Sequence, residues 1–139
     1  MRLSTLSLLT GSVLLMAGGL QAHHSHVPFY HLDQVVEITG VVKKFRLINP
    51  HPELLLEVMG ANGEPEEVMV YAQAYAGQMR EVGGWNNDSV KAGDTVTATG
   101  HPGRGSVTSV MGQTLTTPSG DVLDMRFFDL LKPPGPRSQ

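Results

Sequence analysis

The sequence predicts an all-β domain, and three observations predict it. Apolar residues alternate with polar ones through five or six short segments, which is the period of a strand with one face on a core. Turn-forming residues separate these segments, and one short stretch with helical spacing lies between the third and the fourth. Five strands with a helix in that place match the OB-type Greek-key barrel. We therefore expect a small OB-like barrel of five to six strands with one short helix, preceded by a signal peptide; a small β-sandwich is the alternative.

Residues 1–22 have the three parts of a secretory signal peptide. Arg2 supplies the positive charge, Leu6–Gly18 is the apolar run, and Ala22 ends an acceptable cleavage site. An uncleaved membrane anchor is the alternative, but a spanning helix needs about 20 apolar residues, and this run is shorter. The chain has no cysteine for a lipid anchor. We therefore expect a periplasmic or secreted protein.

Cleavage after Ala22 leaves 117 of the 139 residues, enough for one domain with a single core. The absence of cysteine excludes disulfides and thiol chemistry. Without Arg2, nine basic side chains face thirteen acidic ones. This balance argues against nucleic-acid binding, which favours a basic surface. We expect no membrane association once the signal is removed.

The mature chain divides into three predicted parts. Residues 23–33 are a polar, histidine-rich arm interrupted by Pro28, residues 34–131 are the OB-like barrel, and residues 132–139 are a proline-rich tail that we expect to be disordered.

The first strand of the barrel runs from Gln34 towards Phe45. Its spacing places two sets of residues on opposite faces, Val36, Ile38, Gly40 and Val42 against Val35, Glu37, Thr39, Val41 and Phe45. Gly40 suggests a bend of the kind that lets a strand coil round a small barrel. The segment Asn49-Pro50-His51-Pro52 ends the strand, because proline removes ladder donors.

A hairpin and a short helix follow. Alternating apolar residues at 54–58 and 68–72 flank the turn signal Asn62-Gly63. Residues 74–82 have helical spacing, with Tyr75, Met79 and Val82 predicted on one face and Gly83-Gly84 as the terminator.

The remaining strands are predicted after Trp85, which we expect to plug one end of the barrel. A turn at 91–94 leads into a strand at 95–100 and a glycine-rich loop at 101–105. Segments 107–117 and 122–128 complete the β-structure, with a turn at 118–121 between them.

Several of these segments together resemble a family of short bacterial exported proteins, DUF6152. The matching segments are His23-His24-Ser25, the strand 36–42, Asn49-Pro50-His51, Gly84-Trp85 and the stretch 90–96 leading to Gly100. The resemblance covers most of the mature chain and implies an exported OB-like barrel, without an established activity or catalytic residue. His26 and the proline-rich tail depart from the family's usual pattern.

The histidines are the candidate chemistry. All six follow the predicted cleavage site: His23, His24, His26, His31, His51 and His101. Neutral imidazole is a favoured ligand of copper, zinc and nickel. Cleavage after Ala22 would give His23 both an α-amine, whose pKa is about 7.7–8.0, and an imidazole, which together chelate one ion. We expect His23 and His24 as primary ligands of copper and His51 as the ligand from the barrel, with His26, His31 and His101 in reserve.

Other interpretations remain open at this point. The arm is alternatively a solvated segment that binds metal adventitiously, or a pH sensor, since free histidine titrates near pH 6.5. His51 and His101 alternatively serve only as hydrogen-bonding residues at strand ends. The methionines at 59, 69, 79, 111 and 125 are dispersed, so we expect core packing rather than a copper(I) site.

The leading hypothesis is an exported, non-enzymatic barrel that binds a metal ion, copper most plausibly, or an unknown periplasmic partner. The second is a binding module for a peptide, glycan or protein, which an apolar or aromatic groove on one barrel face would favour. The third is an oxidase with a histidine-brace copper, which needs the α-amine, His23 and another histidine to converge. No phosphate loop or nucleophile elbow supports nucleotide-dependent or hydrolytic chemistry.

Overall fold

The computed structural model describes residues 28–105 and 108–126. The described residues form, in order, β1 (Val36–Arg46), β2 (Glu53–Met59), β3 (Pro65–Ala72), α2 (Ala76–Glu81), β4 (Thr95–Pro102), β5 (Ser109–Thr116) and β6 (Val122–Asp124). The predicted signal peptide, residues 23–27 of the arm and the proline-rich tail lie outside them. Within the described part of the chain, no helix has the length and apolar character to cross a membrane.

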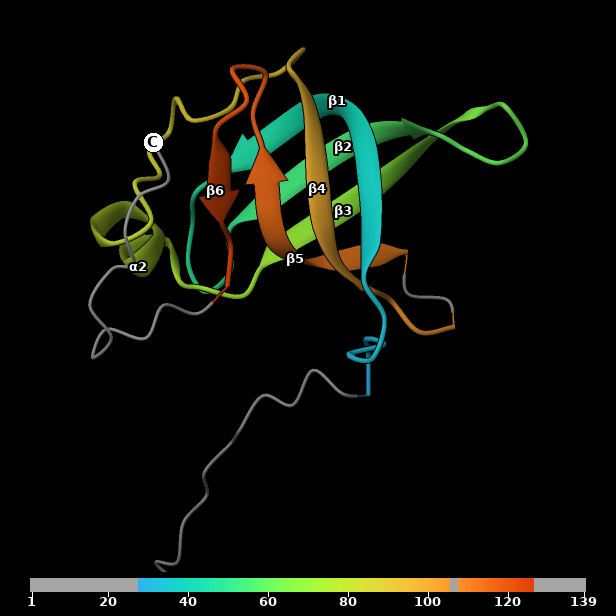
Figure 1. Cartoon of the computed structure of the whole chain (residues 1–139), viewed down its shortest axis with the longest axis horizontal. Coiled ribbons are helices and arrows are strands. Elements are labelled where there is room, and N and C mark those ends of the chain that lie inside the picture. The colour runs from blue at the N-terminus through green and yellow to red at the C-terminus, as the bar shows by residue number, and fades with distance from the viewer. Residues whose placement is uncertain (1–27, 106–107, 127–139) are drawn as a thin grey trace, which may run out of the picture.

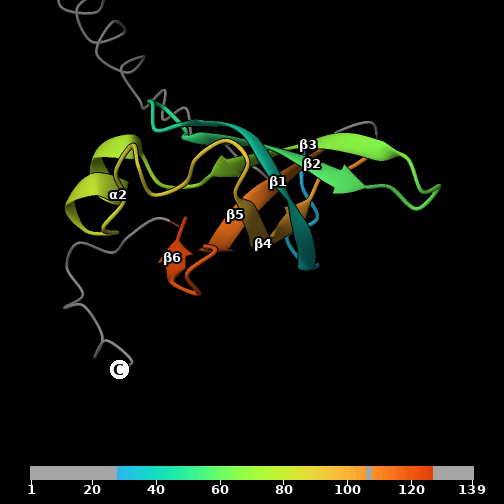
Figure 2. The ribbon, with the colours of Figure 1, turned by 90° about the horizontal axis from the view of Figure 1, so that it is seen from above.

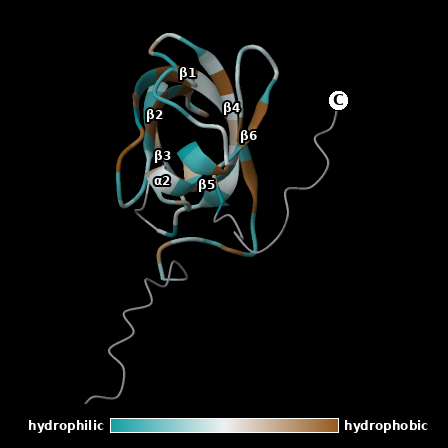
Figure 3. Cartoon of the chain, turned by 90° about the vertical axis from the view of Figure 1, so that its left-hand side faces the viewer, coloured by the Kyte–Doolittle hydropathy of each residue, from teal (hydrophilic) through white to brown (hydrophobic). Residues whose placement is uncertain are grey.

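Five of these strands close into a barrel (Figure 1). β1 pairs antiparallel with β2 and β4, β2 pairs with β3, and β4 pairs with β5. The parallel pairing of β3 with β5 closes the ring, and β6 is added to β5 outside it. Figure 3 shows the ring end-on, with α2 at one mouth. The predicted OB-like barrel, with its helix between the third and fourth strands, is confirmed.

β1 bends so that it can pair with strands on both of its edges. A Cβ atom at Gly40 would lie 2.7 Å from the carbonyl oxygen of Glu57, closer than real contacts allow. Only glycine therefore lets β2 approach β1 at this position. The bend that the sequence predicted for this strand is seen in Figure 1.

A bulge further along β1 changes which residues face the core. The register with β2 shifts between Val42 and Lys44, so one extra residue interrupts the alternation. Phe45 consequently turns inward, where its ring centroid lies 5.6 Å from that of Trp85. The prediction that Phe45 lies on the face opposite Val42 was wrong for this reason.

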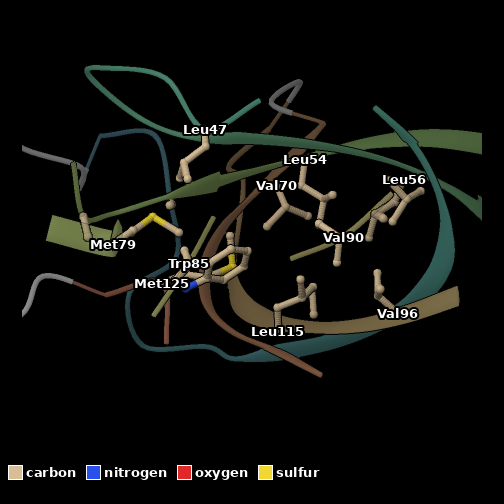
Figure 4. Close-up of a cluster of buried hydrophobic side chains, with 14 of the residues drawn as sticks. Leu47, Leu54, Leu56, Val70, Met79, Trp85, Val90, Val96, Leu115 and Met125 are labelled. Atoms are coloured by element: carbon tan, nitrogen blue, oxygen red, sulfur yellow. The ribbon is translucent and has the colours of Figure 1, made fainter. Parts of the chain in front are cut away.

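The barrel interior is filled by apolar side chains from β1 to β5, α2 and the loops (Figure 4). The largest fully buried members are Trp85, Leu54, Leu56, Met79, Leu115 and Met125. Trp85 is 2% exposed, and its Nε1–H donates to the carbonyl oxygen of Asp124 at 2.9 Å. The indole ring is thus packed at the α2 end of the barrel, as predicted, and its N–H group is hydrogen-bonded.

The predicted apolar face of the helix is wrong in two of its three residues. Met79 is buried, but Tyr75 and Val82 are 49% and 45% exposed. Tyr75 is the N-cap residue and Val82 the C-cap residue of the six-residue α2, so both lie outside its helical turns. Ala76 and Met79 form the buried contact instead.

The β2–β3 hairpin extends beyond the barrel on the side away from α2 (Figure 2). Met59, near its tip, is 71% exposed. Core packing was the expected role of Met59 and of Met69, and that prediction was wrong for both: Met59 is exposed among the described residues, and Met69 lines a depression on the outer surface. Met79, Met111 and Met125 are buried, as predicted.

Candidate functional site

The outward surface of the first three strands carries an unusual set of neighbours. The residues Lys44, Leu55 and Met69 lie side by side across β1, β2 and β3. Arg46, Glu53 and Tyr71 form the next row, two residues further along each strand. We call these two rows the outer β1–β3 face. Each strand alternates, so this surface lies opposite the one that fills the barrel.

A shallow depression of about 190 Å³ lies in this face. Leu55 and Met69 form its apolar part, and Lys44, Arg46 and Glu53 line the remainder. An apolar floor with a few polar groups at the edge is the usual composition of a ligand site.

The charges around the depression are unequally paired. The Arg46 guanidinium forms an ion pair with the Glu53 carboxylate, in which Nε donates to Oε2 at 2.9 Å. Lys43, beside the face, donates to Glu57 Oε2 at 2.9 Å, and this contact raises the pKa of Lys43. No carboxylate of the described residues lies within ion-pair distance of Lys44. The depression therefore has one cation whose charge the described residues leave uncompensated.

Tyr71 extends the face towards β5. Its register partner there is Met111, which in turn pairs with His101 of β4. Burial raises the pKa of Tyr71, and the nearby Glu53 and Tyr30 raise it further. The phenol is therefore neutral at pH 7 and offers an aromatic surface with a hydroxyl beside the Arg46–Glu53 pair.

The described end of the arm is bound to the barrel at the far edge of this surface. Tyr30 forms a β-bridge with Gly103, and its hydroxyl lies 3.0 Å from the Ser109 hydroxyl. Arg104 donates to the arm twice, from its backbone N–H to Phe29 O at 2.8 Å and from Nε to Tyr30 O at 2.9 Å. The arm thus continues the antiparallel path of β1 along β4.

The three described histidines lie in different places. His101 is held at both ring nitrogens: Nδ1 lies 2.7 Å from Gln34 O, and Nε2 lies 3.0 Å from Gln113 Nε2. Nδ1–H therefore donates to the carbonyl, and Nε2 accepts from the amide. His101 thereby links Gln34, just before β1, to Gln113 of β5, which favours the hydrogen-bonding interpretation.

His51 lies on the loop between β1 and β2. Its Nδ1 is 3.1 Å from Ala72 O, and its ring stacks on that of Tyr75 with centroids 6.3 Å apart. Since a carbonyl only accepts, Nδ1 carries the proton and Nε2 carries the lone pair. The imidazole is thus fixed in orientation and tautomer.

The structure does not bring the predicted metal ligands together among the residues it describes. His31 lies on the bound part of the arm, His101 at the end of β4 and His51 beside β3, and the described residues contain no group of three potential metal ligands. His23, His24 and His26 lie outside the described residues.

A larger polar groove of about 1470 Å³ lies between the loop after α2 and the β5–β6 hairpin. Its polar groups largely satisfy one another. Asp94 accepts from the Lys91 backbone N–H, Ser119 donates to Asp121, and Asp124 pairs with Arg126. We regard this groove as a surface built from self-contained turns.

The outer β1–β3 face was not predicted from the sequence, although one signal marks it. Leu54, Leu55 and Leu56 are three consecutive leucines in a strand. Because alternate residues of a strand point to opposite sides, a run of three must place at least one leucine outside the core. Here that residue is Leu55.

The comparison with protein families decides the relationship of this chain. Residues 12–112 match the family model of DUF6152, described as a family of unknown function. The chain belongs to DUF6152. The match includes β1 to β4 and the start of β5, so the outer β1–β3 face of this DUF6152 protein lies within it. A comparison with curated proteins finds no match.

Proposed function

We propose that this DUF6152 chain is an exported, periplasmic or secreted binding protein that holds an extended ligand across the outer β1–β3 face. The observation that carries the proposal is the depression floored by Leu55 and Met69. A soluble barrel gains nothing in stability from a recessed apolar floor that faces outward, whereas a ligand gains apolar contact there.

Two further observations support this surface over the larger groove. The corresponding face of OB-type barrels binds oligomeric ligands, and Tyr71 adds an aromatic residue in the next row of the same face. The larger groove, in contrast, is lined mostly by polar turn residues with partners of their own.

The test uses two defined probes, a random peptide library displayed on phage and an array of immobilised glycans. We expect the purified protein to select binders from one of them, and Leu55→Glu to weaken those binders at least about tenfold by placing a charge on the floor. Leu55 is the cross-strand partner of Lys44, so the introduced glutamate gains an opposite charge beside it and the variant should fold.

The matched control is Val122→Glu, since Val122 is an exposed apolar residue on β6, away from the face. Selection from neither probe would overturn the proposal, as would binders that the two variants weaken equally.

A second candidate function, copper binding, is favoured by the orientation of His51. Histidines that ligate metals usually donate their other ring N–H to a carbonyl or carboxylate, as His51 does to Ala72. The full donor set would comprise this Nε2 with the α-amine of a processed chain, His23 and His24; His26, His31 and His101 are the reserve ligands. Such a site would bind the metal and hold it in place, and we propose no reaction for it.

Mass spectrometry and calorimetry test this candidate. We expect the exported protein to begin at His23 and to bind copper(II) more tightly than micromolar, with affinity lost on replacing His23 and His24. A mature chain beginning at His24 or later, or micromolar copper binding unchanged by the replacements, would contradict it.

A further inference from the structure

We infer that the larger groove, between the loop after α2 and the β5–β6 hairpin, is a docking surface for residues 127–131 of the same chain. These residues follow directly on Arg126, the last described residue, and lie outside the described part of the chain. The inference does not depend on the proposed function, because it concerns a surface other than the outer β1–β3 face.

The sequence of this run favours a covered position. Residues 127–131 read Phe-Phe-Asp-Leu-Leu, so four of the five side chains are large and apolar. Such side chains gain the most from leaving water. The residues that follow, 132–139, are prolines, a glycine and polar residues, which gain much less. The run therefore needs an apolar surface close to Arg126.

The groove offers apolar groups that the described residues leave uncovered. Val82 and Val122 both line it, and both are exposed. Its polar groups, in contrast, largely pair with one another. The groove measures about 1470 Å³, more than the roughly 300–1,000 Å³ of a pocket for a drug-sized ligand. It therefore has room for several large side chains and lacks an apolar partner rather than a polar one.

The run begins at the wall of the groove. Arg126 itself lines the groove, and α2 and β6 lie at the same end of the molecule (Figure 1). Val122 precedes Arg126 by four residues, so the two lie at most about 14 Å apart at 3.5 Å per residue. Five extended residues span about 17 Å. The run therefore reaches Val122 and continues towards Val82 in the same groove.

The charge of the groove suits the chain beyond the run. Four carboxylates and two cations line the groove: Asp88, Asp94, Asp121, Asp124, Lys91 and Arg126. Asp88 and Asp124 form ion pairs with those two cations. Among the described residues, no cation lies within ion-pair distance of Asp94 or Asp121, so the groove has an excess of negative charge. Lys132 and Arg137 follow the run and carry the opposite charge.

The covalent connection favours this occupant over a separate molecule. A segment joined to its site by a short linker is present there at an effective concentration of about millimolar. A free ligand of similar composition would have to reach that concentration to compete. The occupant of the groove is therefore the chain itself.

The first test compares two variants of the purified exported protein. One carries Phe127→Ser, Phe128→Ser, Leu130→Ser and Leu131→Ser, and the matched control carries Pro133→Ser, Pro134→Ser and Pro136→Ser. Urea unfolding is followed by the fluorescence of Trp85. We expect the first variant to raise the unfolding equilibrium constant at least about tenfold, because apolar contact is lost, and the control to stay within about twofold of the wild type. An unchanged first variant, or equal losses in both, would overturn the inference.

The second test approaches from the groove and keeps the run intact. Val82 is 45 residues before residue 127, so Val82→Ser changes the amide signals of residues 127–131 in the ¹⁵N-labelled protein only through space. We expect these signals to shift with Val82→Ser and to stay in place with Val35→Ser, a change at an exposed valine outside the groove. Signals that Val82→Ser leaves unshifted, or that both variants shift equally, would overturn the inference even if the first variant fails to fold.

Discussion

β2 presents leucine to both sides of the barrel wall, and the two sides differ in what they do. Leu54 and Leu56 are 1% and 0% exposed and pack in the core with Val70 and Trp85. Leu55, between them, lines the outer depression. If the proposed function holds, adjacent residues of one strand serve folding and ligand binding separately. Substitutions at neighbouring positions should therefore separate the two properties.

The largest difference is expected from truncating one leucine on each side of β2. We expect Leu56→Ala to lower the free energy of unfolding by about 2–5 kcal/mol, because it leaves a cavity in a packed core. Leu55→Ala should lower it by less than about 1 kcal/mol. Urea denaturation followed by the fluorescence of Trp85, the single tryptophan of the chain, measures both. Equal losses would show that the outer leucine is a structural residue.

A second pair of substitutions tests how closely the backbone packs at two glycines, one in the barrel wall and one in α2. A Cβ atom at Gly100 would overlap the carbonyl oxygen of Met111. We expect Gly100→Ala to cost about 1–3 kcal/mol, because β4 and β5 must move apart. Gly77 lies in α2, where an added Cβ meets nothing within 4 Å, so Gly77→Ala should instead stabilise by about 0.5–1 kcal/mol. Thermal unfolding of the two variants should shift in opposite directions; destabilisation by both would contradict the packing described here.

The smallest expected effect concerns Asp124, the last residue of β6, which pairs with β5 outside the ring. Burial alone raises the pKa of its carboxyl, but hydrogen bonds and charge from Arg126 outweigh burial and hold the pKa below its ordinary value. The ion pair therefore stabilises the fold above the unfolded-state pKa of about 3.9, and its contribution is lost as the pH falls through the lower folded-state pKa.

Asp124→Asn removes this pH-dependent contribution. We expect the variant to be slightly less stable than the wild type at pH 7, since the pair is partly exposed and screened, and to approach it at pH 2. Unfolding in urea at both values measures the difference. Asp88→Asn, at a more exposed carboxylate, is the control. A gap between wild type and Asp124→Asn that stays constant with pH would contradict the assignment.

Much of the barrel was predictable because its signals are local. Alternation marked the strands, Asn62-Gly63 marked the hairpin, and Gly40 marked the bend. The wrong predictions concern residues whose position depends on a neighbouring strand. The bulge that turns Phe45 inward depends on the register with β2, and the exposure of Met59 depends on how far the hairpin extends. Neither the strand register nor the extent of the hairpin can be read from the identity of these residues.

The candidate site was less predictable than the fold for the same reason. The clustered histidines of the arm predicted a site there. The outer β1–β3 face is formed by Lys44, Leu55 and Met69, which show no shared pattern in the sequence. They become neighbours only when three strands align in one register. The prediction of copper ligation by the arm histidines and His51 stays a prediction.

The parallel seam between β3 and β5 has a consequence for how quickly the native state forms. Its register partners, such as Met69 and Ser109, are forty residues apart in the chain, and β1 meets β4 across a still longer separation. Loops of that length must close before either pairing stabilises the chain, so refolding should take milliseconds to seconds rather than microseconds. A fragment that ends at Gly105 lacks one side of the seam and should show no cooperative melting transition.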